Sequence, residues 1–245
     1  MRVMFMPEDI LYIVIPAYNE EENIEQVVRD WIPIVENINS ESRLVVIDDG
    51  SKDNTYKKLC ELKNEFKQLE AVTKPNGGHG ATVLYGYHYA LKHNADFIFQ
   101  TDSDGQTLAS EFKSFWYDRE KYAAIIGHRN HRKDGFSRII VTKVLKFVLW
   151  CIFGLSITDA NAPYRLVKRE ILEKYITRIP KDFNLSNVML TVLLVNGKEN
   201  ISFRPITFRP RQGGVNSINL PRIMKIGWQA VKDFSRIKKG LKNNE

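Results

Sequence analysis

The sequence predicts an α/β protein with a mostly parallel sheet and helices on both faces of that sheet. Short apolar runs alternate with longer segments of helical periodicity through the N-terminal half, which is the pattern of repeated strand–helix units. Polar clusters directly follow three of the predicted strands. Because ligands of such sheets collect beyond the carboxyl ends of the strands, the three clusters together predict a binding site.

Four apolar runs are the predicted strands. They are Leu11–Pro16, Leu44–Ile47, Glu70–Thr73 and Phe97–Phe99. Continuous apolar runs of this kind are typical of parallel strands that are buried on both faces. The 245 residues and 43% hydrophobic content suit one α/β domain, or one domain with a C-terminal extension.

Three helices are predicted between these strands. Residues 19–31 begin with acidic side chains, which favour a helix N-terminus, and continue with apolar periodicity. Residues 55–70 form the second predicted helix. A glycine-rich turn at residues 76–80 opens the third, which is expected to end near His93.

The pattern changes after residue 129. Residues 139–153 are apolar around a narrow polar stripe and are too short to span a bilayer, which predicts an interfacial helix. The alternatives are packing of this segment against the sheet, or against a second copy in a homodimer. A second amphipathic helix is predicted over residues 221–241.

The positive charge is concentrated near the C-terminus. Of the net charge of +7, residues 204–242 carry ten Lys/Arg and one acid, a balance of +9. Such a patch suits phosphate groups or an anionic membrane surface. Nucleic acid is not expected as a partner, because an aromatic stacking platform is missing.

Cellular location is predicted from the cysteines and the first residues. Cys60 and Cys151 are far apart in the sequence and have no metal or redox spacing, so we expect reduced thiols. The first ten residues lack a charged region followed by a long apolar run. We therefore expect a cytoplasmic protein, peripheral on the cytosolic face of a membrane.

The segment after the fourth predicted strand has the composition of a metal site. Asp102, Asp104 and Gln106 alternate along it, so the two carboxylates would share a face if the chain stayed extended. Mg²⁺ and Mn²⁺ prefer oxygen ligands and often take only one or two carboxylates while phosphates supply the rest. The pattern indicates a seat for Mg²⁺ or Mn²⁺ with a diphosphate, and the alternative is a solvated acidic turn.

Five motifs in order give the chain a broader resemblance. They are IVIPAYNEEENI at 13–24, VVIDDGSKDNT at 45–55, NGGHGATVLYGYHYA at 76–90, FQTDSDGQ at 99–106 and DANAPYRLVKREIL at 159–172. Together they resemble the inverting family-two glycosyltransferases of the GT-A fold. The resemblance is greatest to dolichyl- and polyprenyl-phosphate sugar synthases and extends over residues 11–211. It implies a glycosyltransferase domain at 1–210, followed by a basic loop and amphipathic helix at 211–245.

The resemblance implies a nucleotide site on the first two loops. Pro16, Tyr18 and Glu20 resemble the first nucleotide-contacting loop, and Asp48 and Asp49 resemble the acids that meet the base and ribose. Carboxylates suit these contacts because a base N–H and ribose hydroxyls are donors. The alternatives are a capping role for either aspartate at the 52–55 turn, and ordinary packing for Tyr18.

The resemblance also implies the metal and phosphate contacts. Asp102, Asp104 and Gln106 are the implied metal ligands, and Asp102 and Ser103 are placed with the nucleotide. Arg129, in a G-x-R position, is the implied phosphate contact, because arginine presents paired donors to phosphate oxygens.

The acceptor is predicted from a missing acid. Family members that glycosylate an alcohol need a general base, yet residues 182–187 offer only Asp182, with asparagine where an acid is often found. A phosphate monoester is already largely dianionic at pH 7 and needs only cationic positioning. Four arginines are candidates for that positioning: Arg129, Arg138, Arg209 and Arg211. Residues 209–217 also resemble the family's mobile basic loop near the acceptor.

The predicted function is an inverting, metal-dependent transfer of a sugar from a GDP- or UDP-linked donor to a polyprenyl phosphate. Asp104, Arg129, Arg209 and Arg211 are the predicted catalytic residues, with a homodimer or a membrane partner subunit as possible assemblies. One alternative is a carbohydrate hydroxyl acceptor, with Asp182 as base. The other is a non-catalytic protein that binds sugar nucleotides or membranes.

Overall fold

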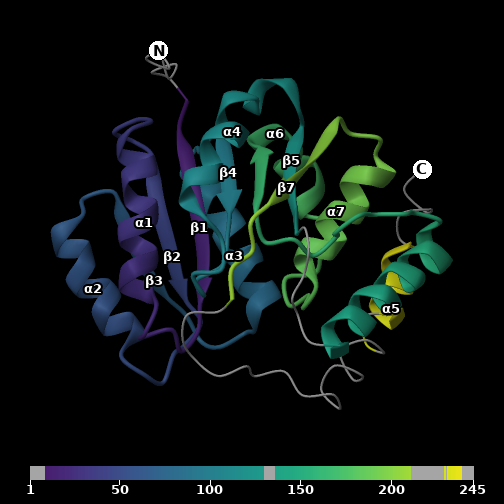
Figure 1. Cartoon of the computed structure of the whole chain (residues 1–245), viewed down its shortest axis with the longest axis horizontal. Helices are drawn as coiled ribbons and strands as arrows, with labels where there is room; N and C mark the ends of the chain where they lie inside the picture. The colour runs from purple at the N-terminus through teal and green to yellow at the C-terminus, as the bar shows by residue number, and fades with distance from the viewer. Residues whose placement is uncertain (1–8, 130–135, 211–228, 230, 239–245) are drawn as a thin grey trace.

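A seven-stranded sheet organises the protein (Figure 1). The computed structural model describes residues 9–129, 136–210, 229 and 231–238, without the side chains of 136–142. The spatial order of the strands is β3-β2-β1-β4-β6-β5-β7. The strands are β1 (Leu11–Ala17), β2 (Arg43–Asp48), β3 (Leu69–Thr73), β4 (Phe97–Gln100), β5 (Ala124–Arg129), β6 (Arg165–Lys168) and β7 (Ile201–Ile206).

The predicted mostly parallel sheet is confirmed, with one exception. β6 runs antiparallel to both of its neighbours, β4 and β5, while the other pairings are parallel. From β1 the chain builds outward to β2 and β3, then returns to place β4 on the other side of β1. A crevice is expected where the strand order reverses, beyond the carboxyl ends of β1 and β4.

Strand alternation sends side chains into two cores. Leu11, Ile13 and Ile15 of β1 pack on one face of the sheet, while Tyr12 and Val14 pack on the other. The first face is covered by α1 (Ile24–Glu36), α2 (Thr55–Glu65) and α4 (Phe112–Tyr117). The second face is covered by α3 (His79–Lys92), α5 (Phe136–Phe153), α6 (Arg169–Ile176) and α7 (Ser186–Asn196). Short 3₁₀ turns occupy Ala109–Glu111 and Arg119–Lys121.

Two predicted helix boundaries were wrong. The helix predicted at 19–31 is displaced to α1, because Asn19 has a positive φ of 54° and belongs to a loop that is hydrogen-bonded to the next one. Pro33 does not end α1, whose buried Val35 still packs on the sheet. The helix predicted at 55–70 ends at Glu65, because the following residues join the sheet edge as β3.

The helix predicted at 139–153 is confirmed within α5. Several of its large apolar side chains are exposed, unlike those of a helix that packs only in the core. Leu149 is buried, whereas Val144, Phe147 and Trp150 are 53%, 63% and 60% exposed. In the described part of the chain no helix has both the length and the apolar character needed to cross a bilayer. Both cysteines are free and exposed.

The C-terminal helical residues 231–238 lie beside α5 (Figure 1). Phe234 is fully buried, and its ring lies 6.0 Å from that of Phe153. Lys238 Nζ donates to the carbonyl of Ile152 and so satisfies an unpaired acceptor at the end of α5. Most of the helix predicted at 221–241 lies outside the described residues.

Candidate functional site

The loops after β1 and β2 are joined by hydrogen bonds. Asn19 N–H donates to Ser51 Oγ at 2.9 Å, and Lys52 N–H donates back to Asn19 Oδ1 at 2.8 Å. Glu20 N–H donates to Thr55 Oγ1 at 2.8 Å. The two loops therefore form one unit at the carboxyl edge of the sheet.

The predicted first nucleotide loop divides into supporting and available side chains. Pro16 is buried within β1. Glu20 is 7% exposed, and its carboxylate accepts the Asn23 amide at 2.7 Å. Tyr18 is 43% exposed, so among these three residues it is the one open to a ligand.

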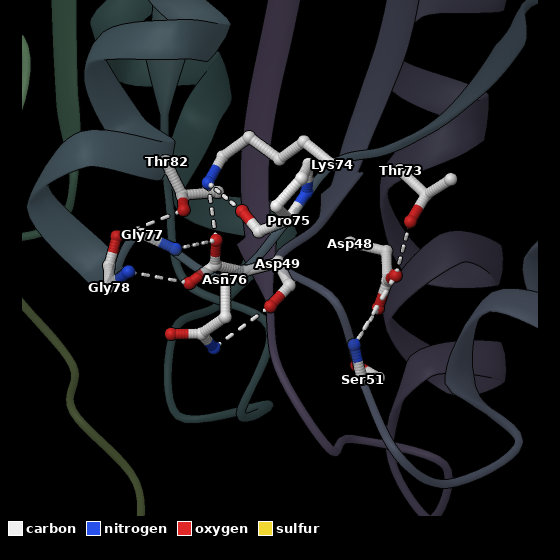
Figure 2. A network of polar contacts seen from close by, with 10 residues as sticks. All are labelled: Asp48, Asp49, Ser51, Thr73, Lys74, Pro75, Asn76, Gly77, Gly78 and Thr82. Carbon is white, nitrogen blue, oxygen red and sulfur yellow. Dashed lines mark hydrogen bonds and ion pairs between the residues drawn. The ribbon is translucent and has the colours of Figure 1, made fainter.

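The adjacent carboxylates at the end of β2 point in opposite directions, as Figure 2 shows. Asp48 is 2% exposed and accepts the Thr73 hydroxyl at 2.7 Å and the Ser51 N–H at 3.2 Å. It therefore joins the end of β3 to the turn after β2. The capping alternative at the 52–55 turn is not what these contacts show, because the N–H groups of Lys52 and Thr55 donate to Asn19 Oδ1 and Asp53 Oδ1 instead.

Asp49 holds the loop that precedes α3. One carboxylate oxygen accepts the Gly77 N–H and the other accepts the Gly78 N–H, both at 2.8 Å, and Lys74 forms an ion pair with the group (Figure 2). Burial opposes ionisation of Asp49, but the hydrogen bonds from Lys74, Gly77 and Thr82 outweigh it, and the pKa lies below its ordinary value. Gly78 has a φ of 85°, a conformation that glycine adopts without a steric penalty.

The predicted metal ligands lie on a loop rather than on an extended strand. β4 ends at Gln100, so strand alternation does not set the directions of Asp102 and Asp104. Both aspartates are half-buried, whereas Ser103 and Gln106 are 5% and 7% exposed. The Gln106 N–H donates to Asp104 Oδ1 at 3.1 Å, which stabilises the turn.

Two hydrogen bonds bring Arg209 to this loop. Its N–H donates to the Gln106 carbonyl at 2.8 Å, and Gln106 Nε2 donates to the Arg209 carbonyl at 2.7 Å. The Arg209 side chain is exposed. Two sequence predictions cannot be placed: Arg211 lies outside the described residues, and the side chain of Arg138 is not described.

The donor set after β4 fits Mg²⁺ or Mn²⁺ shared with a diphosphate. In the described ranges, no three or more His, Cys, Asp or Glu side chains cluster to hold a metal ion by themselves. Two carboxylates and the amide oxygen of Gln106 are hard oxygen donors from one short loop. A hard cation bound there would take its remaining ligands from phosphate and water.

Arg129 is held by a partner that the sequence analysis did not identify. Asp159 accepts Arg129 Nε at 2.8 Å and Nη2 at 2.9 Å, and Phe208 lies 5.2 Å from the guanidinium carbon. The charged pair fixes the plane of the arginine next to the strand end. Asp159 is the first residue of the fifth motif. No feature of the sequence indicates that it pairs with Arg129, which is 30 residues away.

A second arginine, Arg165, is fully buried on β6. Its guanidinium donates to the carbonyls of Ala162 at 2.6 Å, Asn187 at 2.9 Å and Ala160 at 3.3 Å, and to Thr191 Oγ1 at 3.2 Å. Burial lowers its pKa from the ordinary value. This cation therefore fixes the start of α7 to the strand beside β4.

Comparison with known proteins identifies the family. A sequence profile described as Glycosyl transferase family 2 matches residues 12–176, more than half of the chain. The chain belongs to glycosyl transferase family 2. The matched range includes the loops after β1, β2 and β4.

Three curated relatives of this family-two glycosyltransferase are informative. It is 29% identical to UDP-N-acetylglucosamine–dolichyl-phosphate N-acetylglucosaminyltransferase of Methanococcus voltae, over 69% of this chain and 73% of the relative. It is 26% identical to polyprenol monophosphomannose synthase of Mycolicibacterium smegmatis, over 87% and 82%. It is 27% identical to undecaprenyl-phosphate 4-deoxy-4-formamido-L-arabinose transferase of Proteus mirabilis, over 66% of this chain and about half (49%) of the relative.

Solved structures confirm the GT-A-like fold. Glucosyl-3-phosphoglycerate synthase from Mycobacterium tuberculosis superposes with a TM-score of 0.69 at 17% identity, covering 95% of this chain and 81% of that one. Another structure of that enzyme, with Mn²⁺, UDP and glucosyl-3-phosphoglycerate, has a TM-score of 0.66 at 18% identity, covering 91% and 78%. At these identities the likeness concerns the fold.

We expect Asp49→Asn to destabilise the family-two domain at pH 7. The amide cannot accept both glycine N–H groups and the lysine, and the lost charge-assisted bonds cost about 2 kcal/mol. Because the folded-state pKa is lowered, the ionised carboxylate stabilises the fold above its ordinary pKa of 3.8 and loses this effect as the pH falls. Denaturant unfolding should therefore show a wild-type advantage at pH 7 that shrinks toward pH 3. Equal stabilities at pH 7 would contradict the assignment.

Proposed function

We propose that this family-two glycosyltransferase transfers a sugar from a nucleotide sugar to a polyprenyl phosphate, with inversion at the anomeric carbon. The names of the three relatives above all contain a dolichyl, undecaprenyl or polyprenol group. The donor is a GDP- or UDP-linked sugar. The proposed site is the carboxyl edge of the sheet, with the acceptor on the cytosolic leaflet.

The proposed acceptor rests on the side chain that reaches the end of β4 from the start of α7. This side chain is Asn187, which is 2% exposed and donates its amide to Gln100 Oε1 at 3.1 Å. An amide cannot remove a proton from an alcohol. Asp182, the acid available in the same segment, is exposed. The arrangement favours an acceptor that needs no general base.

A phosphate acceptor satisfies the chemistry. An oxygen of the phosphate dianion attacks the anomeric carbon, and the bond from that carbon to the leaving diphosphate breaks with its electron pair. The products are a sugar phosphodiester and a nucleoside diphosphate, and no proton needs to be removed. Arg129 and Arg209 are proposed to position the phosphates, because arginine presents planar paired donors.

The loops have separate proposed roles in donor binding. Tyr18 is exposed and lies after β1, where a base or ribose would bind. Asp102, Asp104 and Gln106 would hold Mg²⁺ or Mn²⁺, which offsets the charge that gathers on the leaving diphosphate. Asp48 and Asp49 already accept protein hydrogen bonds, so we propose that they shape the nucleotide pocket in addition to any direct contact.

The acceptor test is a panel of UDP- and GDP-sugars with polyprenyl phosphate or a sugar alcohol. With a phosphate acceptor, the rate should rise with pH through roughly 6 and then level, because the second phosphate pKa lies there. Asp182→Asn should keep most of the activity. Arg209→Ala should raise the KM for the phosphate acceptor while donor binding persists.

Other results would change the assignment. Transfer to a sugar hydroxyl that is lost in Asp182→Asn would favour the carbohydrate-acceptor alternative. Nucleotide-sugar binding without transfer to any acceptor in the panel would favour the non-catalytic alternative.

The metal test uses Asp104. Asp104→Ala should abolish transfer and Asp104→Asn should nearly do so, because an anionic ligand beside the diphosphate is lost. The melting temperature should change little, since Asp104 is on a loop. Glu61→Ala, an exposed acid on α2, is the matched control and should behave as wild type. Full activity of Asp104→Ala, or of the wild type in excess chelator, would refute a metal-dependent reaction.

We further propose that α5 attaches the protein to an anionic membrane in the plane of the headgroups. Phe147 and Trp150 are exposed, and their rings are 6.2 Å apart, next to the exposed Lys143 and Lys146. Adjacent exposed aromatic side chains with basic neighbours suit a lipid interface. Lys232 and Arg236, also exposed, are on the helical residues beside α5.

Vesicle sedimentation tests this attachment. Binding to vesicles containing phosphatidylglycerol should weaken with salt, and Phe147→Ser with Trp150→Ser should reduce it by at least ~10-fold, from the apolar burial lost. Tyr117→Ser removes a 67% exposed aromatic from α4 and should have no effect. A wild-type protein that stays in the supernatant at low salt would refute membrane attachment. If it also sediments as a dimer in the ultracentrifuge, the apolar face joins two copies.

A further inference from the structure

A buried chain of amides lies beneath the proposed metal loop. Asn187 Nδ2 donates to Gln100 Oε1 at 3.1 Å, and Gln100 Nε2 donates to Asp102 Oδ1 at 3.2 Å. Gln100 is fully buried and Asn187 is 2% exposed, whereas the Asp102 side chain is 26% exposed. These two hydrogen bonds therefore connect the core to the edge of the site.

All described contacts of the Asp102 carboxylate fall on one oxygen. Oδ1 accepts from Gln100 and lies 3.7 Å from His79 Nε2, at the start of α3. In the described part of the chain, Oδ2 is the oxygen left for another ligand. A carboxylate whose rotation is fixed in this way presents one oxygen in a constant direction.

Asn187, at the buried end of this pair of hydrogen bonds, is fixed through its main-chain carbonyl. The Asn187 carbonyl accepts the Arg165 guanidinium at 2.9 Å and the Thr191 hydroxyl at 2.8 Å. The Asn187 side chain is therefore held by an anchored backbone, and changing that side chain leaves the arginine contact in place. β6 also pairs Arg165 directly with Gln100 across the antiparallel ladder, so both side chains lie on the face of the sheet that α7 covers.

We propose that Asn187 and Gln100 are positioning residues that orient Asp102 toward a divalent cation. This inference rests on the proposed metal site. Hydrogen-bonded partners behind a ligand fix its direction and tune its affinity, and their loss typically costs 10- to 100-fold in metal affinity or activity. Asn187, from the segment where a general base would be expected, thus supports the donor side of the reaction.

The test measures Mn²⁺ binding rather than transfer. Free Mn²⁺ is followed by electron paramagnetic resonance with the full chain and saturating UDP, or GDP in parallel. Asn187→Ala should weaken Mn²⁺ binding by about 10-fold or more. Sugar transfer by this variant should recover at high Mn²⁺. The Mn²⁺ concentration needed for half-maximal transfer should therefore change more than kcat. Asn187→Leu, which keeps the volume without a donor, should behave in the same way and serves if the alanine variant does not fold.

Ser186→Ala is the matched control. Ser186 is buried next to Asn187, and among the residues that the structure describes its hydroxyl has no hydrogen-bond partner, so its loss should leave Mn²⁺ binding within about twofold of wild type. Wild-type Mn²⁺ affinity in both Asn187 variants would overturn the positioning role alone. An equal loss in Ser186→Ala would overturn it too, as a packing effect. A wild type that binds no Mn²⁺ with either nucleotide would overturn the metal site and, with it, this inference.

Discussion

The ionised carboxylate of Asp49 is the contact on which the other parts of the site depend. It holds the N–H groups of Gly77 and Gly78 and thereby fixes where α3 begins. The start of α3 in turn packs tightly on the segment before α7, since a Cβ on Gly80 would lie 2.2 Å from the Phe183 carbonyl. α7 then brings Asn187 under β4. One buried anion thus connects the end of β2 to the loop that is proposed to hold a metal.

The charged side chains that support the site are either paired with an opposite charge or surrounded by hydrogen-bond acceptors. Arg129 is paired with Asp159, and Arg165 is surrounded by carbonyl groups. A buried polar group without a partner costs free energy, so these networks are satisfied before any ligand arrives. Tyr18 and Arg209 are exposed and the Asp102 side chain is 26% exposed, whereas Arg165 is fully buried and the side chains of Arg129 and Asp159 are each 11% exposed. Arg165 and Asp159 therefore hold the site in shape, whereas Arg129, which Asp159 orients, remains a proposed phosphate contact.

α5 shows that the apolar side chains of a helix can be turned toward the core or toward solvent. Its buried contact with the core is made by Leu149, while Phe147 and Trp150 are left in solvent. Apolar periodicity predicts that a helix has an apolar face, but it does not say what covers that face. The contact with Phe234 and Lys238 holds α5 at its C-terminal end and leaves the aromatic pair exposed.

The class of fold, the strands from β1 to β4 and the three loops of the site follow from the amino-acid sequence alone. These features are local: apolar runs specify buried strands, and the polar residues that follow lie together because parallel strands end at one edge. The sequence did not determine the start of α1, because loop-to-loop hydrogen bonds at Asn19 override the helical pattern. Nor did it predict the antiparallel β6 or the burial of its Arg165.

The residues that support the site are brought together by contacts between elements that are distant in sequence. Asp159 is 30 residues from Arg129, and Asn187 is 87 residues from Gln100, so neither pairing has a local signal. The direction of Asp102 is likewise set by side chains from β4, α3 and α7 together. Residue types that can bind a ligand are visible along a chain, but their orientation comes from packing between elements that are distant in sequence.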